Sequence, residues 1–209
     1  MSTPLLIFPC NGNAVEALDC LGESFEPIGF VDDSPEKLGT ERFGLPVLPR
    51  SALQKYPDAQ VLAVPGGPAS YRTRAAAVQS LGVREDRFAK VIHPAACVSP
   101  RARVGFNVLI MAGVVITSNA VIGNHVCILP NTVVHHDSTV GDWALIGSNV
   151  TIAGSVAVGA NAYIGSGCSV KNGLKVGEGA LLGLGSNVIR DVPADTTVAG
   201  NPARTLRDA

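Results

Sequence analysis

The sequence predicts a small α/β domain over residues 1–90, followed by a solenoid of short stacked strands over residues 91–209. Two observations support this division. An aliphatic residue occurs at every sixth position, beginning with Ile92 and ending with Val188, without a single insertion. The N-terminal part instead alternates short apolar runs with helical segments. A fixed short period is typical of a repeat architecture, and alternating strands and helices are typical of a parallel sheet.

The six-residue repeat carries a second signal that identifies its inward positions. The residue four after each aliphatic residue is usually small or β-branched, and the residue directly after the aliphatic one is often glycine. Side chains alternate across a strand, so a residue and the one two before it share a face. Both signals therefore mark inward positions, while glycine allows the chain to turn tightly at each corner. The pattern predicts short strands bent at regular corners and stacked into turns.

The N-terminal part contains three predicted strands and two main predicted helices. The strands cover residues 5–8, 27–31 and 60–64, and residues 45–48 form a short extended segment. The first helix covers residues 14–21 with Asn13 as its N-cap, and a later helix covers residues 70–81. A short helix between them ends at Tyr56 and Pro57. This order predicts a small parallel, Rossmann-like sheet.

Three loops follow the predicted strands of this sheet and should lie along one edge. Ligands of open parallel sheets bind at the carboxyl ends of the strands. Each loop alone is equally consistent with a plain turn, but together they predict a ligand site. The candidate residues are Asn11, Gly12, Asn13, Asp32, Asp33 and Gly66. No G-x-G-x-x-G motif follows the first strand, so a nicotinamide cofactor is not expected.

The overall composition favours a cytoplasmic protein that binds small molecules. The chain has 209 residues, a formal net charge of −1 and no basic block, which argues against a nucleic-acid partner. No apolar run reaches the length of a membrane span, and no charged signal-peptide start is visible. The five cysteines form no CxxC pair and are expected to be free thiols. Cys168 falls on an inward repeat position and is expected in the core.

The segment Val134-His135-His136-Asp137 is the strongest candidate for catalysis. Val134 is an inward position, so the three residues after it lie around a corner and face outward. An aspartate beside a histidine can fix the tautomer of the imidazole and raise its basicity, as a general base requires. The spacing alone does not choose between His135 and His136. A polar corner without any chemistry remains the alternative.

Two other histidines have less specific positions. His93 precedes a proline at the domain junction and is expected to be structural. His125 is on an outward position and is expected to be solvated or at an interface. Leu109, Leu145 and Leu181 are also outward, at spacings of thirty-six residues, which is twice eighteen. They predict an apolar stripe that is buried between the copies of a trimer.

Several motifs together resemble one group of enzymes. They are His136-Asp137 followed by Val140-Gly141 and Ile152-Ala153-Gly154, the strand end Phe30-Val31-Asp32-Asp33, the segment Ile92-His93-Pro94-Ala95, and the closing A-G-N-P-A-R of residues 199–204. Over nearly the whole chain, this pattern resembles the sialic acid O-acetyltransferase and nucleotide-aminosugar N-acetyltransferase group of the hexapeptide-repeat acyltransferases. The resemblance implies a left-handed parallel β-helix with three hexapeptides in each triangular turn, so that residues eighteen apart stack.

The resemblance also implies the roles of particular residues. His136 would be the catalytic base and Asp137 its acidic partner. The protein would be a homotrimer that needs no metal, with acetyl-CoA bound between adjacent β-helices and the acceptor's nucleotide held by the N-terminal domain. Small residues would leave room for the pantetheine arm, and nearby cations would face the phosphates. The small residues are Gly154, Gly165, Ser166, Gly167 and Gly183, and the cations are Arg204, Lys171, Lys175 and Arg190.

Three departures from the group concern the acceptor loop, the surroundings of the thioester and the neighbour of the base. The first loop of the group commonly reads G-A-G-G-H, whereas residues 9–13 here read P-C-N-G-N. Some members have a second histidine nine residues after the base, where this chain has Leu145. His135 stands where the group often has glutamate, and we place it next to the acceptor. A charged His135 would lower the proton affinity of His136.

The expected function is acetyl transfer from acetyl-CoA to the amino group of a nucleotide-linked sugar in bacterial surface-glycan biosynthesis. Transfer to a sugar hydroxyl, as in a sialic acid O-acetyltransferase, would use the same base and is the close alternative. A zinc carbonic anhydrase would need three histidines that converge on one metal. A non-catalytic β-helix scaffold would leave the pair His136-Asp137 without a role.

Overall fold

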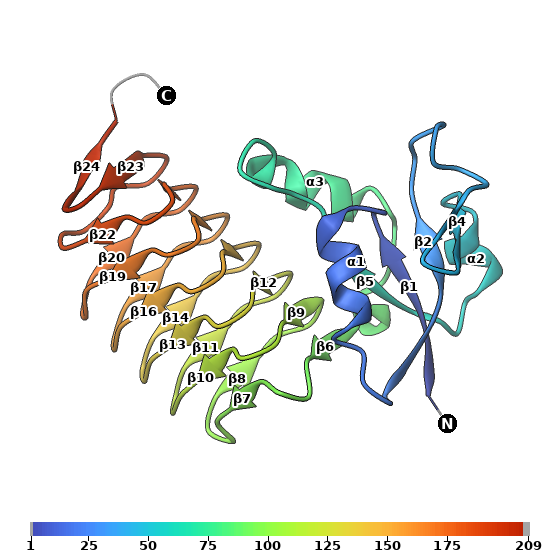
Figure 1. The fold of residues 1–209 in the computed structure, drawn as a ribbon, viewed down its shortest axis with the longest axis horizontal. Helices are drawn as coiled ribbons and strands as arrows, with labels where there is room; N and C mark the ends of the chain where they lie inside the picture. The colour runs from blue at the N-terminus through green and yellow to red at the C-terminus, as the bar shows by residue number, and fades with distance from the viewer. Residues whose placement is uncertain (1, 207–209) are drawn as a thin grey trace.

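The computed structural model describes residues 2–206 as a sheet domain joined to a long three-sided β-helix (Figure 1). The sheet domain has five strands in the order β3-β4-β2-β1-β5. The parallel strands are β1 (Thr3–Phe8), β2 (Phe25–Val31), β4 (Leu45–Leu48) and β5 (Gln60–Ala63), and β3 (Glu41–Arg42) runs antiparallel to β4. Leu5, Leu6 and Ile7 are fully buried because β1 lies between β2 and β5 and is covered on both faces. The predicted sheet is therefore confirmed, with one antiparallel edge strand added.

Short helices connect these strands. They are α1 (Gly12–Leu18), α2 (Ala52–Lys55), α3 (Arg74–Gln79) and two 3₁₀ turns, η1 (Tyr71–Thr73) and η2 (Glu85–Arg87). The predicted N-cap of the first helix is wrong by two residues. Asn11, not Asn13, caps α1, because the Asn11 side-chain oxygen accepts a hydrogen bond from the Ala14 N–H at 2.9 Å. Asn13 lies in the first turn of α1, and its side chain does not cap the helix.

The β-helix consists of three parallel sheets, which we call its first, second and third faces. The first face contains β6 (Lys90–Ile92), β9 (Val108–Ile110), β12 (Cys127–Ile128), β15 (Leu145–Ile146), β18 (Tyr163–Ile164), β21 (Leu181–Leu182), β23 (Thr197–Gly200) and the antiparallel β24 (Ala203–Thr205). The second face contains β7 (Cys97–Val98), β10 (Val115–Ile116), β13 (Val133–Val134), β16 (Thr151–Ile152), β19 (Ser169–Val170) and β22 (Asn187–Val188). The third face contains β8 (Arg103–Val104), β11 (Val121–Ile122), β14 (Thr139–Val140), β17 (Ala157–Val158) and β20 (Lys175–Val176).

Stacked strands pair in the register that the repeat predicts. Val133 pairs with Val115 on one side and with Thr151 on the other, so each turn takes eighteen residues. The corner after each face carries the number of that face, so the second corner joins the second and third faces. The inward aliphatic residues form one continuous buried core along the prism. Cys168 is fully buried in it and lies 3.0 Å from the Gly183 carbonyl oxygen, as expected for a core residue.

The sheet domain packs on the first face of the β-helix, with α1 on the side of the sheet that faces the prism (Figure 1). Outward side chains of that face, including Leu109 and Leu145, are buried against Leu21 and Tyr71 of the sheet domain. Leu181 is partly buried in the same cluster. The interpretation of these leucines as a stripe between copies is therefore wrong, because the chain covers the stripe with its own N-terminal domain.

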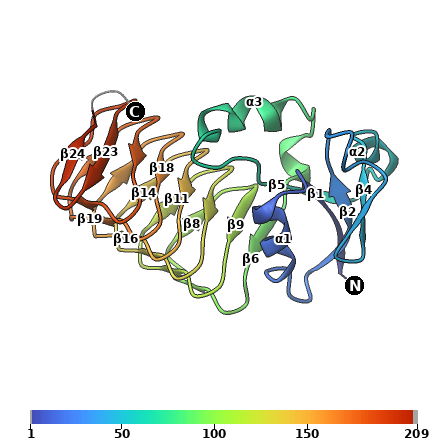
Figure 2. The same ribbon diagram turned by 45° about the horizontal axis from the view of Figure 1, so that its top comes forward.

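A buried arginine connects the two domains. Arg74 is only 2 % exposed, and its guanidinium donates hydrogen bonds to the carbonyl oxygens of Pro65 at 2.7 Å, of His125 at 3.0 Å and of Trp143. Burial lowers the pKa of Arg74 to about 10, so the group stays charged at neutral pH. Figure 2 shows α3, which begins with Arg74, reaching from the sheet domain towards the β-helix.

His125 lies in the same interface rather than in solvent. Its ring stacks on Trp143 with centroids 3.7 Å apart, and its Nδ1 is 2.8 Å from the Asn107 side-chain nitrogen. Burial and the nearby Arg74 lower its pKa to about 4, so the ring is neutral at physiological pH. Of the two expected positions, the solvated one is wrong. The interface is internal, between the two domains of one chain.

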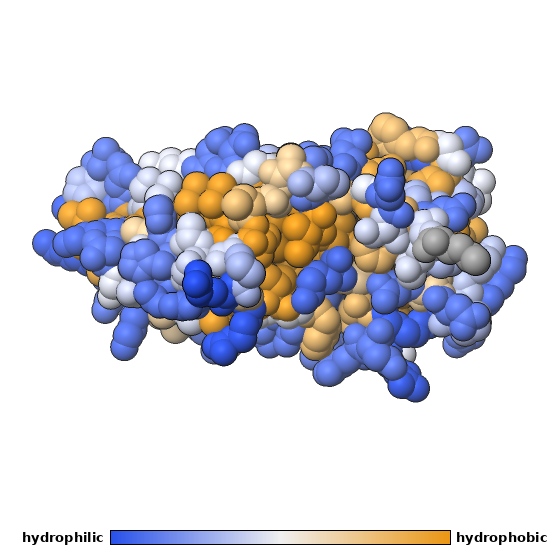
Figure 3. All heavy atoms as spheres, turned by 90° about the horizontal axis from the view of Figure 1, so that it is seen from below, coloured by the Kyte–Doolittle hydropathy of each residue, from blue (hydrophilic) through white to orange (hydrophobic). Residues whose placement is uncertain are grey.

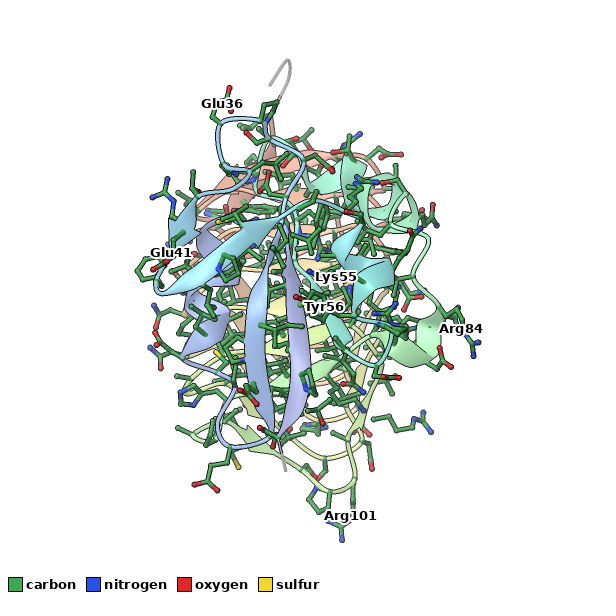
Figure 4. All side chains as sticks on the ribbon, turned by 90° about the vertical axis from the view of Figure 1, so that its right-hand side faces the viewer. Glu36, Glu41, Lys55, Tyr56, Arg84 and Arg101 are labelled. Carbon is green, nitrogen blue, oxygen red and sulfur yellow. The ribbon has the colours of Figure 1, made fainter. Side chains whose placement is uncertain are left out.

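Several charged side chains lie at the periphery of the sheet domain and of the adjoining β-helix turn. Viewed from the end of the sheet domain, Glu36, Glu41, Arg84 and Arg101 project outward around the rim (Figure 4). The helices between residues 2 and 206 are all too short or too polar to cross a lipid bilayer.

Candidate active site

His136 and Asp137 form a hydrogen-bonded pair on the second corner, directly after β13. His136 Nδ1 is 2.7 Å from Asp137 Oδ2, and Asp137 Oδ1 accepts a hydrogen bond from the Asn119 side chain at 3.0 Å. These two hydrogen bonds lower the pKa of Asp137, which therefore stays a carboxylate. A carboxylate on Nδ1 holds the proton on that nitrogen and leaves Nε2 as the free basic atom.

Gly154 occupies the equivalent corner one turn further along, beside the free nitrogen of His136. A Cβ atom at Gly154 would lie 2.6 Å from His136 Nε2, so only glycine leaves the ring in this place. Within residues 2–206 the Gly154 N–H donates no hydrogen bond to the protein. A basic nitrogen and a free backbone donor thus lie side by side, which is the arrangement that acyl transfer requires.

His135 has a different environment from its neighbour. It is half-buried, and its backbone N–H donates a hydrogen bond to the Ile152 carbonyl oxygen at 2.9 Å. Its side chain makes no hydrogen bond to any residue that the structure describes. The pairing with Asp137 and the contact with Gly154 belong to His136 alone. The geometry therefore favours His136 as the base, a choice that the spacing left open.

The loops after β1 and β5 come together at the carboxyl edge of the sheet. The Asn11 side chain donates a hydrogen bond to the Val64 carbonyl oxygen at 3.2 Å. The Asn13 side chain donates to the carbonyl oxygens of Val64 and Gly66, both at 3.4 Å. Gly12 begins α1, and a Cβ atom there would meet no other atom within 4 Å. Four of the predicted acceptor residues are therefore neighbours in space.

The carboxylate of Asp32 is already committed to the protein. It is 5 % exposed and accepts hydrogen bonds from the N–H groups of Cys10 and Ser34, both at 2.9 Å, and from Lys37 Nζ at 3.0 Å. Burial raises its pKa, but these hydrogen bonds outweigh burial and the net pKa is lowered. Asp32 thus joins the first loop to the end of β2. A ligand at this edge of the sheet would contact the neighbours of Asp32 more readily than the Asp32 carboxylate.

Asp33 lies on the surface and makes a bidentate ion pair with Arg50, with oxygen–nitrogen distances of 2.6 Å and 2.7 Å. Gly66 has a φ of +111°, and a Cβ atom there would lie 2.6 Å from the aliphatic carbons of Arg74. The packing of the buried arginine therefore requires glycine at position 66, independently of any ligand.

A cleft of about 210 Å³ lies between the two domains, next to these loops. Its walls come from the sheet domain and from the first face and first corner of the β-helix, and most of them are apolar. The lining residues are Asn13, Gly66, Gly67, Pro68, Leu129, Leu145, Ile146, Gly147 and Tyr163. The sequence placed the loop with Gly67 at this edge, but it missed Pro68 and Tyr163 as site residues. No pattern in the chain places Tyr163 in the same cleft as Asn13, because the cleft depends on how the two domains pack together.

The predicted acetyl-CoA residues fall on two different corners. Gly154 is on the second corner with His136, whereas the others with small side chains are on the first corner, beside the cleft. A Cβ atom at Gly147, which lines the cleft, would lie 2.5 Å from the Ser166 backbone nitrogen. Arg204 is exposed on β24 and donates to the Ala203 carbonyl oxygen. The first-corner residues are Gly165, Ser166, Gly167 and Gly183.

The remaining histidines do not join His136. His125 is on the third corner, stacked on Trp143 between the domains. His93 Nδ1 accepts a hydrogen bond from the Ala95 N–H at 2.9 Å, which supports a structural role. Among residues 2–206, no three His, Cys, Asp or Glu side chains are grouped closely enough to hold a metal ion. These side chains therefore do not form the three-histidine zinc site that a carbonic anhydrase needs.

Comparison with known proteins supports both the repeat and the whole architecture. The bacterial transferase hexapeptide (six repeats) family matches residues 101–134 and 119–154. None of the curated proteins matches the chain by sequence. Among solved structures, a variant of perosamine N-acetyltransferase from Caulobacter crescentus, in complex with CoA and GDP-perosamine, is 28 % identical with a TM-score of 0.85. The match covers 100 % of this chain and 98 % of that one.

Two further structures are similar over their full length. The acetyltransferase domain of PglB from Neisseria gonorrhoeae, in complex with acetyl coenzyme A, is 26 % identical with a TM-score of 0.85, and the match covers 99 % of this chain and 100 % of that one. WeeI from Acinetobacter baumannii is 25 % identical with the same TM-score and the same coverage. The fold is therefore an α/β domain followed by a left-handed β-helix of hexapeptide repeats, as the resemblance implied.

Proposed function

We propose that this chain, which has the hexapeptide repeats and the two-domain fold of these acetyltransferases, transfers an acetyl group from acetyl-CoA to the amino group of a nucleotide-linked sugar in bacterial surface-glycan biosynthesis. The observation that carries the proposal is the position of His136. Its Nδ1 is bound to Asp137 at 2.7 Å, and its Nε2 faces the backbone of Gly154. The perosamine N-acetyltransferase, similar along its whole length, supports an amino sugar as the acceptor. The reaction would take place in the cytoplasm, where the five cysteines stay reduced.

The residues of the second corner can perform each proton movement of this reaction. Acetyl-CoA supplies the acetyl group as an activated thioester. His136 Nε2 takes a proton from the amine as the new N–C bond forms, and Asp137 stabilises the resulting positive charge on the ring. The Gly154 N–H is the donor for the thioester carbonyl oxygen, which becomes negative as the N–C bond forms and is neutral again once the C–S bond has broken. His136 then returns the proton to the departing thiolate, so that free CoA and the acetylated amine leave.

The acceptor cleft and His136 lie on opposite sides of one prism. The cleft is against the first face and first corner, whereas the second corner is opposite the first face. One chain therefore does not bring its own base to its own cleft. We propose a homotrimer in which the second corner of each copy faces the cleft and first corner of the next copy. This arrangement also brings Gly154 of one copy close to Gly165 and Gly183 of its neighbour, with acetyl-CoA between them.

The surface of the β-helix supports an assembly of this kind. Figure 3 shows a hydrophobic area in the middle of the molecule, over the part of the β-helix nearer the sheet domain, flanked by hydrophilic side chains. Outward positions on the second and third faces include Val115, Val121 and Val133, all only partly buried in the single chain. Unlike the leucines of the first face, these side chains are not covered by the sheet domain. They are available to pack against a second copy.

The function is tested by incubating the protein with acetyl-CoA and a panel of nucleotide-linked amino sugars. Thiol release should be seen with at least one of them, and the product should gain one acetyl group as an amide. An amide resists hydroxylamine, whereas an ester from transfer to a hydroxyl is cleaved by it. Absence of thiol release with every amino sugar, or a product that hydroxylamine cleaves, would contradict N-acetylation.

Filling the cleft should impair acceptor binding alone. A Cβ atom at Gly67 meets nothing within 4 Å, so Gly67→Trp adds a ring to the cleft without straining the backbone. We expect the KM for the acceptor to rise by about tenfold or more and the KM for acetyl-CoA to stay near the wild-type value. Gly67→Ala is the matched control and should behave like the wild type. Equal increases in both KM values would show that the cleft does not belong to the acceptor.

A further inference from the structure

The cleft between the domains contains one hydroxyl group that the protein itself does not use. Tyr163 lies on β18, and its side chain lines the cleft. Among residues 2–206 the hydroxyl of Tyr163 has no hydrogen-bond partner, although the side chain is partly buried. The other β-helix residues of the wall are Leu129, Leu145, Ile146 and Gly147, which offer no polar side chain. The hydroxyl is open to the cleft, so a ligand there can pair with it in place of water.

The position of the phenol is fixed by its surroundings. The rings of Tyr163 and Tyr71 are 5.7 Å apart at an angle of 47°, and the Tyr71 hydroxyl donates a hydrogen bond to the Gly179 carbonyl oxygen at 2.9 Å. Tyr163 also pairs in register with Leu145 and Leu181 on the neighbouring strands. Burial raises its pKa, so the hydroxyl remains protonated and can donate at any physiological pH. The Tyr163 hydroxyl is therefore a hydrogen-bond donor with a defined position in the cleft.

A matching acceptor group lies across the cleft. The amide nitrogen of Asn13 donates to the carbonyl oxygens of Val64 and Gly66, which leaves its side-chain oxygen free to accept. Asn13 and Tyr163 are the polar side chains among the lining residues, one from each domain. A donor and an acceptor in otherwise apolar walls can recognise one hydroxyl group of a sugar whose C–H face packs on the apolar part of the wall.

We propose that Tyr163 is a specificity-determining residue that donates a hydrogen bond to one hydroxyl of the acceptor sugar. The inference rests on the proposed function and names a residue of its acceptor site. The hydrogen bond would favour an acceptor that has this hydroxyl over an analogue that lacks it. Analogues that keep this hydroxyl but differ elsewhere should not lose this hydrogen bond.

The test compares wild type and Tyr163→Phe, a change that removes one oxygen and keeps the ring. We expect the KM for the acceptor to rise about 3–10-fold, with the KM for acetyl-CoA and the melting temperature unchanged. Acceptor analogues that each lack one hydroxyl identify the partner. One analogue should be a poorer substrate for the wild type, yet equal to the parent sugar for Tyr163→Phe. Tyr71→Phe is the control, because its hydroxyl is bonded within the protein, and it should keep the discrimination of the wild type.

The outcomes separate this inference from the function on which it rests. If the wild type acetylates an amino sugar but Tyr163→Phe has the same KM and the same discrimination among the analogues, the role of Tyr163 is overturned and the function stands. If the wild type acetylates no amino sugar, the function is overturned and the inference with it. A lower melting temperature of Tyr163→Phe with an unchanged ratio of the two KM values would show a structural role only, which also overturns the inference.

Discussion

Replacement of His136 by alanine should lower kcat by about 10²–10⁴, the usual contribution of a positioned general base. Its Nε2 is the basic atom next to the Gly154 backbone, and no other side chain of the second corner has this position. Binding of acetyl-CoA should survive, because the backbone of the corners does not depend on the ring. Steady-state kinetics measure the loss of turnover, and calorimetry with CoA measures the binding.

The neighbours of His136 provide matched controls. His135→Ala should cost much less, since the His135 side chain has no hydrogen bond within the described residues and does not contact Gly154 in the way that His136 does. Asp137→Asn should fall between the two, because the ring loses its negative partner but keeps a hydrogen bond. Near-normal turnover of His136→Ala, together with a large loss in His135→Ala, would show that His135 is the base and that the assignment to His136 is wrong.

Replacement of Arg74 by methionine should destabilise the protein by about 2–4 kcal/mol. Methionine fills a similar apolar volume but leaves the carbonyl oxygens of Pro65, His125 and Trp143 without their donor in a buried place. The loss of the buried charge offsets part of this cost. For a chain of this size, the change corresponds to a melting temperature lower by about 5–15 °C, which calorimetry measures.

Arg72 is the matched control for this prediction. Its side chain is half exposed. It pairs with Asp195 at 3.3 Å and donates to the Tyr71 hydroxyl at 2.9 Å and to the Gly179 carbonyl oxygen at 3.1 Å, and water can replace these partners. Arg72→Met should therefore change stability by less than about 1 kcal/mol. If both variants melt at the wild-type temperature, the contacts of Arg74 do not hold the domains together.

Local patterns in the sequence were sufficient to predict most of the fold. The inward aliphatic residues occur at every sixth position, and the structure buries them in one core. The outward positions were harder, because exposure of an outward side chain depends on what packs against it. We predicted that a partner copy covers Leu109 and Leu145, but the sheet domain of the same chain covers them. Arg74 and His125 meet across about fifty residues of sequence, which no local pattern can reveal.

The candidate site also has one part that the sequence predicts and one part that it does not. His136 and Asp137 are adjacent, and Gly154 is one turn away, so the repeat predicts that they meet. The cleft depends on the docking of two domains, and Tyr163 was therefore missed. Asp32 was predicted to reach a ligand, but Lys37 and two backbone groups already bind its carboxylate. A carboxylate at the end of a strand has the same sequence signal in both roles.

The central claim is that each active site is built from two copies of the chain. Chains carrying His136→Ala and chains carrying Gly67→Trp are co-expressed with different tags, and trimers that contain both are purified through both tags. A ring of three copies that contains both variants has one position where an intact His136 faces an intact cleft. At an acceptor concentration below the wild-type KM, the mixed trimers should therefore recover about one third of wild-type activity. His136→Ala alone should stay nearly inactive, and Gly67→Trp alone should keep about a tenth or less. Mixed trimers no more active than the separate variants would contradict a site shared between copies.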